Sequence, residues 1–461
     1  MNLTNFYLDQ HGCAKNQTDG ELIITYLENA GFKQTLNASE ADFILVNSCG
    51  FINSAKQESI DAVYNIKAAY PKAKIILTGC LAERYSKLMF DSMPELDGVF
   101  GNGNLAKIAD FMKQYKIESS ERFMKTYPQV GICSASRKSL LNFSGSAYVK
   151  ITEGCSNHCS FCAIPLIRGE VRSRPVESVL QEIKELVERG IYEINLIGQD
   201  LAVFGLENKE SLPYLLSKIS ELEGDFVVRL LYIHPDHFSK DIIKEIKKDK
   251  RFLHYFDIPF QTGDDDIIVA MNRVGPASEY IDTIRYIKSE LPDAVIRTTF
   301  LTGFPGESDE NAENTYNFLK EIRPDWSGCF TYSREEDTPA YSMKPRVPAK
   351  VAKARAERLE QLQSTITEEN LKKYVGITTD VLIEEIITNN KELSEDSDEG
   401  LALGRAWFQA PEVDGCIVVR YDLTQKKDVD AIKPGNLVSV RILSVSGVDL
   451  DSRFVELSQH K

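Results

Sequence analysis

The 461-residue sequence has little that would take it into or across a membrane. No window approaches the roughly 18 uncharged apolar residues that a membrane span requires, and the N-terminal MNLTNFYLDQHG lacks the basic and apolar regions of a secretory signal. Basic charge is also scarce, because 54 Lys and Arg face 69 Asp and Glu, for a net charge of -15. This balance repels a phosphate backbone. We therefore expect a cytoplasmic protein with no membrane partner and no strong binding of free nucleic acid.

The motifs of common hydrolases and nucleotide-binding enzymes are missing as well. There is no Gly-x-Ser-x-Gly, no His-Glu-x-x-His and no Walker loop. The nine cysteines are an odd number, and in a reducing compartment they will not form a disulfide framework. Cys133, Cys329 and Cys416 stand alone, and we interpret them as small buried apolar side chains. The other six cysteines fall into two sets that need a chemical explanation.

The first set lies in an expected α/β domain at residues 1–115. Strand patterns at 3–8, 41–47 and 74–78 alternate with helical patterns at 17–30 and 54–70, as in a doubly wound parallel sheet. Cys13, Cys49 and Cys80 each come just after one of these strands. Ligands bind at the carboxyl edge of such sheets, so these three thiols are expected to converge on one crevice.

The second set begins an expected barrel domain at 141–372, after a polar linker at 116–140. Cys155, Cys159 and Cys162 directly follow its first strand, so their loop lies on the catalytic face. A charged amphipathic helix at 348–374 is expected to pack against the barrel. Six strand patterns with helices between them predict a partial (β/α) barrel, at 147–152, 193–197, 226–233, 255–259, 295–301 and 328–333.

The C-terminal part predicts a small all-β barrel at 375–446, followed by a tail at 447–461. It is rich in Val, Ile and Thr, with turn signals at Asp414-Gly415 and Pro434-Gly435. Residues 375–461 contain 16 acidic and 9 basic side chains, a net charge of -7. This part of the chain is acidic in its own right.

Cys155-x3-Cys159-x2-Cys162 places three thiolates on one short loop, which suits a cubane iron-sulfur cluster. A fourth cysteine is missing, so one iron stays open for another ligand. The alternative is a zinc site completed by His158. It ranks lower, because His158 directly precedes Cys159 and no second Cys-x2-Cys pair lies nearby.

The sequence around this loop resembles a known family, the radical S-adenosylmethionine methylthiotransferases. The resemblance rests on the run from Lys150 to Pro165, KITEGCSNHCSFCAIP, followed by Arg168-Gly169 and Arg172-Ser173-Arg174-Pro175. It covers essentially the whole chain, as an N-terminal domain with three spread cysteines, a radical-SAM barrel and a C-terminal TRAM domain. We therefore expect three modules in this order: a doubly wound α/β domain, a partial (β/α) barrel and a small all-β barrel.

The resemblance implies two [4Fe-4S] clusters and S-adenosylmethionine as cofactors. The cluster on Cys155, Cys159 and Cys162 would bind S-adenosylmethionine, whose reductive cleavage gives a radical that abstracts hydrogen from an unactivated carbon. The cluster on Cys13, Cys49 and Cys80 would hold the methylated sulfur that is transferred, with a second S-adenosylmethionine as methyl donor. The cofactors then carry the hard chemistry, so no side chain is expected to be catalytic. An electron donor of the flavodoxin or ferredoxin type is implied.

Five residues at predicted strand ends are candidates to border S-adenosylmethionine by the same analogy. An ordinary loop or capping role is equally compatible with each of them. The candidates are Gln199, Arg297, Thr302, Gly303 and Glu307.

The family divides into a MiaB-type branch that modifies tRNA and a RimO-type branch that modifies an aspartate of the twelfth small-subunit ribosomal protein. An acidic C-terminal domain favours a basic ribosomal protein as substrate over tRNA. We therefore predict transfer of a methylthio group to the aspartate β-carbon, with tRNA methylthiolation as the alternative. Sequence segments that resemble the RimO-type branch are Ala163-Ile164-Pro165, Leu230-Leu231-Tyr232, Asp257-Ile258-Pro259, 331–336, 338–341 and 410–415.

Two departures from this branch lie at predicted strand ends. His234-Pro235 replaces an aromatic-Pro pair, as in the tRNA branch, and Thr262-Gly263-Asp264 follows Gln261 where His, a small residue and Ser are expected. Neither departure touches a predicted cluster ligand. A third hypothesis, a non-catalytic metal-binding module that docks on ribosomal components, does not explain two sites that each lack a fourth ligand.

Overall fold

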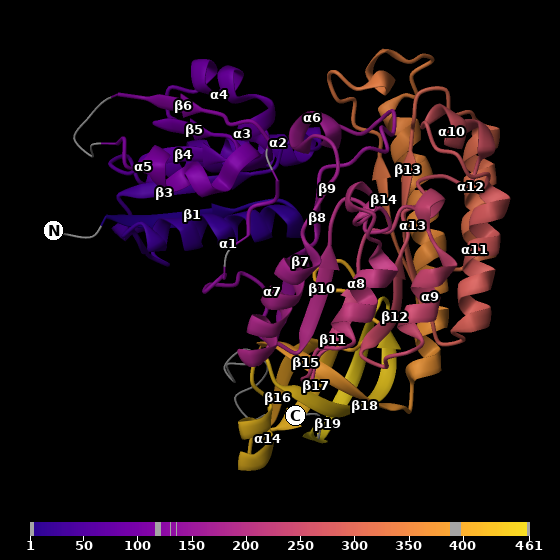
Figure 1. Ribbon diagram of the computed structural model, residues 1–461. Coiled ribbons are helices and arrows are strands. Elements are labelled where there is room, and N and C mark those ends of the chain that lie inside the picture. The colour runs from indigo at the N-terminus through magenta and orange to yellow at the C-terminus, as the bar shows by residue number, and fades with distance from the viewer. Residues whose placement is uncertain (1–3, 116–120, 130, 135, 388–397, 459–461) are drawn as a thin grey trace.

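A computed structural model describes residues 4–115, 121–129, 131–134, 136–387 and 398–458. Figure 1 shows three parts, an N-terminal α/β domain beside the upper end of a parallel barrel and a small closed β-barrel beneath it. The long helix α13 runs along the side of the parallel barrel. The three parts follow one another along the chain in the predicted order: a doubly wound domain, a partial barrel and an all-β barrel.

The N-terminal domain is built on a parallel sheet in the order β2-β1-β3-β4-β5-β6. Every residue of β3 is buried, because helices cover both faces of the sheet and form a separate apolar core on each. The strands are β1 (Asn5–Gln10), β2 (Lys33–Gln34), β3 (Phe43–Ser48), β4 (Lys74–Thr78), β5 (Gly98–Phe100) and β6 (Phe123–Lys125). The helices are α1 (Ala14–Asn29), α2 (Asn53–Ala69), α3 (Gly79–Arg84), α4 (Ser86–Ser92) and α5 (Ile108–Met112).

Part of the expected linker at 116–140 belongs to the sheet instead. β6 pairs in parallel with β5, from Gly98 opposite Phe123 to Phe100 opposite Lys125. The pairing is only three residues long and adds an edge strand, so it needs no long apolar run and leaves little signal in the sequence.

The central domain is a parallel sheet in the order β7-β10-β11-β12-β13-β14, curved into a barrel. The barrel is partial, because β7 and β14 do not pair with each other in the described part of the chain. The helices pack on its outer face, as in other (β/α) barrels. The strands are β7 (Ser146–Lys150), β10 (Glu193–Ile197), β11 (Val227–Leu230), β12 (Phe252–Asp257), β13 (Val295–Thr302) and β14 (Trp326–Thr331), with the short pair β8 (Thr152–Glu153) and β9 (Arg172–Ser173) at the upper end. The helices are α6 (Ile164–Arg168), α7 (Val176–Glu188), α8 (Leu212–Ile219), α9 (Lys240–Ile246), α10 (Asp265–Ala270), α11 (Ala277–Glu290), α12 (Asp309–Ile322) and α13 (Ala349–Leu371).

The C-terminal domain is a closed barrel in the order β15-β16-β17-β19-β18. Its last strand corrects the prediction of a tail at 447–461, because β19 pairs with both β17 and β18 and closes the barrel. Closure removes the unpaired strand edge that a shorter domain would expose. Its elements are β15 (Thr378–Ile386), β16 (Glu399–Arg405), β17 (Ile417–Asp422), α14 (Lys426–Ala431), β18 (Leu437–Ser446) and β19 (Asp449–Leu457).

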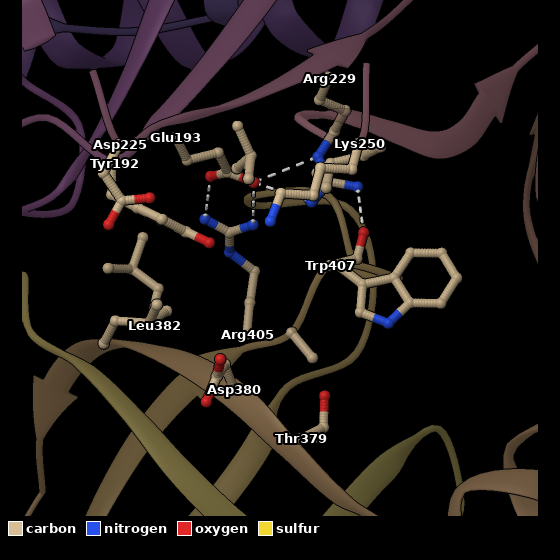
Figure 2. A pocket seen from close by; sticks show the side chains of 14 residues that line it. Tyr192, Glu193, Asp225, Arg229, Lys250, Thr379, Asp380, Leu382, Arg405 and Trp407 are labelled. Atoms are coloured by element: carbon tan, nitrogen blue, oxygen red, sulfur yellow. Dashed lines mark hydrogen bonds and ion pairs between the residues drawn. The ribbon is translucent and has the colours of Figure 1, made fainter. Parts of the chain in front are cut away.

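Buried charges join the two barrels. Figure 2 shows Glu193 of β10 between the guanidinium groups of Arg405 of the C-terminal barrel and Arg229 of β11. The carboxylate lies 2.7 Å from Arg405 and 2.8 Å from Arg229. Arg229 also donates a 2.8 Å hydrogen bond to the main-chain oxygen of Trp407. These groups line a cavity of about 440 Å³ between the barrels.

A loop of the C-terminal barrel also reaches into the lower end of the parallel barrel. The hydroxyl of Tyr255 donates a 2.6 Å hydrogen bond to Asp414, and Nε of Arg297 lies 3.4 Å from the same carboxylate. The floor of the parallel barrel is therefore supplied by the C-terminal domain.

Among the described residues, no helix combines the length and the apolar character needed to cross a membrane.

Candidate active site

The three spread cysteines lie at the carboxyl ends of three adjacent strands. Cys13 follows β1 and is the N-cap residue of α1, Cys49 directly follows β3, and Cys80 lies in the first turn of α3 after β4. Because β1, β3 and β4 are neighbours in the sheet, their ends meet at one edge. Cys13 is exposed, Cys49 is half-buried and Cys80 is buried.

Small residues let the loops of this edge approach one another. A Cβ on Gly50 would lie 2.7 Å from the main-chain carbon of Cys80, so only glycine permits this contact. Burial raises the pKa of Cys49 to about 12, and negative charge on Cys80 and Cys13 adds to the rise. A Cβ on Gly12, the neighbour of Cys13, would likewise lie 3.1 Å from Cβ of Cys49. The loops that carry the three cysteines thus meet at this edge, as the ligands of one metal cluster must.

Cys13 faces the parallel barrel. Although Cys13 is exposed as a residue, desolvation of its thiol by the surrounding protein opposes the charged form. The nearby Lys15 and Arg168 outweigh this effect and lower the pKa of Cys13. Nζ of Lys15 lies 3.3 Å from the ring centroid of Tyr232, which follows β11. Tyr232 has a φ of 71°, a strained conformation for a bulky side chain. The N-terminal domain and the barrel thus meet beside Cys13.

Four buried charges lie at this meeting point. Asp19 comes from α1, Lys150 and Glu153 come from β7 and β8, and Arg168 ends α6. Nη1 of Arg168 lies 2.8 Å from Asp19 and 2.7 Å from Glu153, and Lys150 pairs with both carboxylates. Burial raises the pKa of Glu153, yet Arg168 and Lys150 outweigh it and hold that pKa far below its usual range. Two cations balance two carboxylates.

The second set of cysteines lies on the loop between β8 and α6. The main-chain N–H of Cys155 donates to the oxygen of Gly169 at 3.0 Å, and that of Cys162 donates to the oxygen of Cys159 at 2.9 Å, which folds the loop back on itself. Burial raises the pKa of Cys155 to about 11 and that of Cys162 to about 12, and negative charge on Cys159 adds to both. The three sulfurs are thus carried by one folded loop, residues 155–162.

His158 does not point toward this cysteine set. Its side chain is 57% exposed, and Nε2 lies 3.4 Å from a carboxylate oxygen of Glu170. This outward position speaks against the alternative of a zinc site completed by His158.

A different histidine contacts the loop. Nε2 of His234 lies 3.8 Å from Sγ of Cys159, while Nδ1 accepts a 3.3 Å hydrogen bond from the main-chain N–H of Asp236. An accepting Nδ1 carries no hydrogen, so Nε2 carries it and directs it toward the sulfur. The His234-Pro235 departure noted in the sequence thus lies directly beside the cysteine loop.

Asp200 holds this histidine and the loop together. Its carboxylate accepts hydrogen bonds from Asn157 of the loop at 3.1 Å and from the main-chain N–H of His234 at 3.2 Å. It also lies 2.7 Å from Nδ1 of His237. Asp200, His234 and His237 bring ligand-type atoms within 4.8 Å of one another, but Asp200 already bonds Asn157 of the loop and His234 already contacts Cys159.

The five candidates for S-adenosylmethionine contact lie in two places. Gln199 is beside Glu153, with Nε2 3.5 Å from Oε1, and its own buried Oε1 has no partner among the described residues. Arg297 is buried in the lower barrel, where it pairs with Asp257 at 3.1 Å. Thus Gln199 lies near the cysteine loop, whereas the guanidinium of Arg297 is occupied by carboxylates.

The other three candidates form a turn that is clamped by α13. The hydroxyl of Thr302 donates to the main-chain oxygen of Ala352 at 2.9 Å, the main-chain N–H of Gly303 donates to Glu307, and Arg355 lies 2.9 Å from Glu307. The side chains of Thr302 and Glu307 therefore support the turn itself. Contact of this turn with S-adenosylmethionine stays a prediction.

The residues of both sets fit thiolate-held iron-sulfur clusters. Each set supplies three sulfur donors from one small region, the ligand type that such clusters require. The raised pKa values of Cys49, Cys155 and Cys162 mean that metal binding must displace their protons. The Arg168 guanidinium, whose Nη2 lies 3.2 Å from Sγ of Cys80, provides positive charge beside the thiolate that results.

Sequence reasoning missed the charged residues that connect the two cysteine sets. Arg168, Lys150 and Glu153 were part of the recognised sequence signature without an assigned role, and Asp19 was not singled out. A signal was available, because polar residues 16–19 and 21 interrupt the apolar face of a helix that continues as Leu22-Ile23-Ile24. Charged residues at such positions are buried only when they are paired.

Comparison with known families covers all three parts of the chain. Residues 5–101 match the uncharacterized protein family UPF0004, residues 149–319 match the radical SAM superfamily, and residues 375–455 match the TRAM domain. The ribosomal protein uS12 methylthiotransferase RimO of Treponema denticola is 52% identical over 96% of this chain and 99% of its own length. The enzyme of the same description from a Thermoanaerobacter species is 38% identical over 95% of this chain and 97% of its own.

A solved structure supports the fold. The radical S-adenosylmethionine methyltransferase TsrM of Kitasatospora setae, with cobalamin and a [4Fe-4S] cluster bound, superposes with a TM-score of 0.54. The match covers 74% of each chain at 12% identity. At this identity the likeness concerns the fold alone.

Proposed function

The chain belongs to the family of ribosomal protein uS12 methylthiotransferases and is a radical S-adenosylmethionine enzyme that uses [4Fe-4S] clusters; on this basis we propose that it transfers a methylthio group to the β-carbon of an aspartate in uS12. The observation that carries the proposal is the contact between the two cysteine regions: Arg168, which ends the helix after the second set, bonds Cys80 of the first set at 3.2 Å, and Lys15, two residues after Cys13, lies over Tyr232 of the barrel. A reaction that needs two clusters needs both sites within one region.

Each cysteine set has its own role in the proposal. Cys155, Cys159 and Cys162 hold the cluster that binds S-adenosylmethionine, and Cys13, Cys49 and Cys80 hold the cluster from which sulfur is transferred. When bound, the clusters and S-adenosylmethionine supply the electron, the radical and the methylthio group of the reaction. The protein's own residues fix the two sites relative to each other and enclose them.

The fixing residues are the buried charges and the loop contacts. Arg168, Asp19 and Glu153 join α6 to α1, which ties the cysteine loop of the barrel to the N-terminal domain. Asp200 holds Asn157 and the main chain of His234, so the loop keeps one shape. Fixed distances between reacting groups are what such a two-site reaction requires.

The proposed partners follow from the family and from charge. The basic ribosomal protein uS12 meets a chain of net charge -15, whose C-terminal part is itself acidic. A flavodoxin or ferredoxin type protein supplies the electron, and the reaction takes place in the cytoplasm, where ribosomes are assembled. Binding of free tRNA is weak, because the acidic surface repels its phosphates.

The proposal is tested with three cysteine variants of the reconstituted enzyme under anaerobic conditions. Each is mixed with S-adenosylmethionine, dithionite and uS12 or its loop peptide, and the products are followed by mass spectrometry. C155A/C159A/C162A should lose both 5′-deoxyadenosine formation and methylthio transfer. C13A/C49A/C80A should keep 5′-deoxyadenosine formation and lose the transfer. C133A/C329A/C416A, which removes the lone cysteines, is the matched control and should keep both.

The same mixtures distinguish the alternative substrate. An undermodified tRNA added in place of uS12 should stay unmodified. Methylthio transfer to tRNA together with no transfer to uS12 would overturn the proposed substrate.

A further inference from the structure

Arg168 belongs to one cysteine loop and contacts the other cysteine set. It ends α6, six residues after Cys162 in the sequence. Its side chain is 3% exposed, and Nη2 donates a 3.2 Å hydrogen bond to Sγ of Cys80 on α3. The barrel thus supplies a cation to a sulfur of the N-terminal domain.

Two carboxylates hold the guanidinium in this position. Nη1 of Arg168 lies 2.8 Å from Asp19 and 2.7 Å from Glu153, which leaves Nη2 directed at Cys80. Charge-assisted hydrogen bonds are roughly twice as strong as neutral ones, and burial strengthens them further. Arg168 is therefore a fixed positive charge at a ligand sulfur.

The other cysteine set receives a weaker interaction. His234 directs the hydrogen of Nε2 at Sγ of Cys159 from 3.8 Å, and its Nδ1 accepts a hydrogen bond from the main chain, so the ring is neutral. One set thus has a buried cation at 3.2 Å, and the other a neutral donor at a longer distance.

Positive charge and hydrogen bonds at ligand sulfurs favour the reduced form of an iron-sulfur cluster, because reduction adds negative charge. We propose that Arg168 is a positioning residue that raises the reduction potential of the cluster on Cys13, Cys49 and Cys80 and fixes that cluster against the barrel. The inference rests on the proposed function, because it takes these three cysteines as cluster ligands. The second cluster would then accept an electron more readily than it would without Arg168.

The test uses the full chain with the substitutions C155A/C159A/C162A, so that only the second cluster remains. Its reduction potential is measured by a redox titration followed by electron paramagnetic resonance. R168M in this background should move the midpoint to a more negative potential. E153Q removes a carboxylate that neutralises Arg168 and should move the midpoint in the opposite direction.

Two substitutions serve as controls in the same background. Arg172 lies four residues beyond Arg168 and donates to main-chain oxygens of Arg168, Glu170 and Gly131. R172M removes a nearby positive charge that does not contact a cysteine and should leave the midpoint unchanged. H234Q alters the donor to the other cysteine set and should also leave it unchanged.

The outcomes separate this inference from the proposed function. If the parent with C155A/C159A/C162A holds no iron, the assignment of Cys13, Cys49 and Cys80 fails and the inference fails with it. If the parent holds a cluster and R168M retains it at the parent midpoint, Arg168 has no such role and the proposed function stands. If R168M does not retain iron, the midpoint of the E153Q variant tests the inference instead. A midpoint of E153Q that equals the parent's or is more negative overturns the inference.

Discussion

At the scale of single residues, the most informative feature is Lys150 on β7. It is 3% exposed and pairs with both Asp19 and Glu153, which are themselves buried. A buried ion pair adds little net stability over an apolar contact, but removing one partner leaves an uncompensated buried charge. Lys150 therefore neutralises part of the negative charge of the two carboxylates that are buried where the two domains meet.

The prediction is that K150M lowers the free energy of unfolding by about 3–5 kcal/mol, the range for breaking a buried ion pair. The measurement is anaerobic denaturant unfolding at pH 7. Lys184 is the control, because it is 61% exposed and lies 3.9 Å from Glu188. K184M should change stability by less than about 1 kcal/mol, as exposed pairs do. Equal losses in the two variants would contradict a special role for the buried cluster.

At the scale of secondary-structure elements, helix α13 holds the turn at Thr302–Glu307 in place. Arg355 bonds Glu307 of this turn at 2.9 Å, and one turn further along the helix Arg358 pairs with the exposed Glu313 at 2.6 Å. Both arginines lie on α13 and pair with a glutamate, but only Arg355 contacts the turn that we predict to border S-adenosylmethionine.

We expect R355M to raise the KM for S-adenosylmethionine about tenfold with a smaller effect on kcat, since a lost charge-assisted hydrogen bond is worth about 1.5–3 kcal/mol. The assay is 5′-deoxyadenosine formation at varied S-adenosylmethionine. R358M is the matched control and should leave KM within about twofold, because exposed ion pairs contribute little. An unchanged KM in R355M would place this turn away from the cofactor.

The elements themselves were largely predictable from sequence. β3 and β4 are short apolar runs that are buried on both faces, and such runs are recognised without knowledge of the partner strands. β2 and β6 were missed, because strands of two or three residues carry no periodic pattern. The start of α1 at Ala14 was missed because its first turns are polar yet mostly buried: Asn16 bonds main-chain oxygens of its own domain, and Asp19 pairs with Lys150 of the barrel.

The candidate site was predictable only in part. The spacing of the cysteines after strands indicated where each set would lie, since strand ends of one parallel sheet share an edge. The contact between Arg168 and Cys80 joins residues 88 positions apart in different domains. No local pattern specifies such a contact, because it depends on how two independently patterned domains pack together.

At the scale of the whole molecule, Glu193 connects the two barrels. Its carboxylate is shared by Arg405 of the C-terminal barrel and Arg229 of the parallel barrel (Figure 2). Burial raises the pKa of Glu193, but these two guanidinium groups outweigh burial and hold that pKa far below its usual range. The two guanidinium groups thus favour the charged form of Glu193, and the joint depends on that charge.

We predict that E193Q destabilises the joint by about 3–5 kcal/mol, because two buried guanidinium groups lose their shared counter-charge. Limited proteolysis should cut the segment between α13 and β15 faster than in the parent, and small-angle X-ray scattering should report a larger radius of gyration. Glu399 provides the control, since its pairs with Arg420 and Arg453 are partly exposed and lie within one barrel. E399Q should leave both measurements unchanged, and equal effects would argue against Glu193 as the joint.

The loop that carries Asp414 into the lower end of the parallel barrel has a consequence for the order of synthesis. The ribosome makes the parallel barrel before this loop, so Arg297 and Tyr255 wait for their partner until translation is almost complete. The cysteines of both sets have emerged long before then. The nascent enzyme therefore acquires the cysteines proposed to bind iron first and its finished floor last. A chain released too early would carry an open-bottomed barrel in which Tyr255 lacks its hydrogen-bond partner and Arg297 keeps only Asp257.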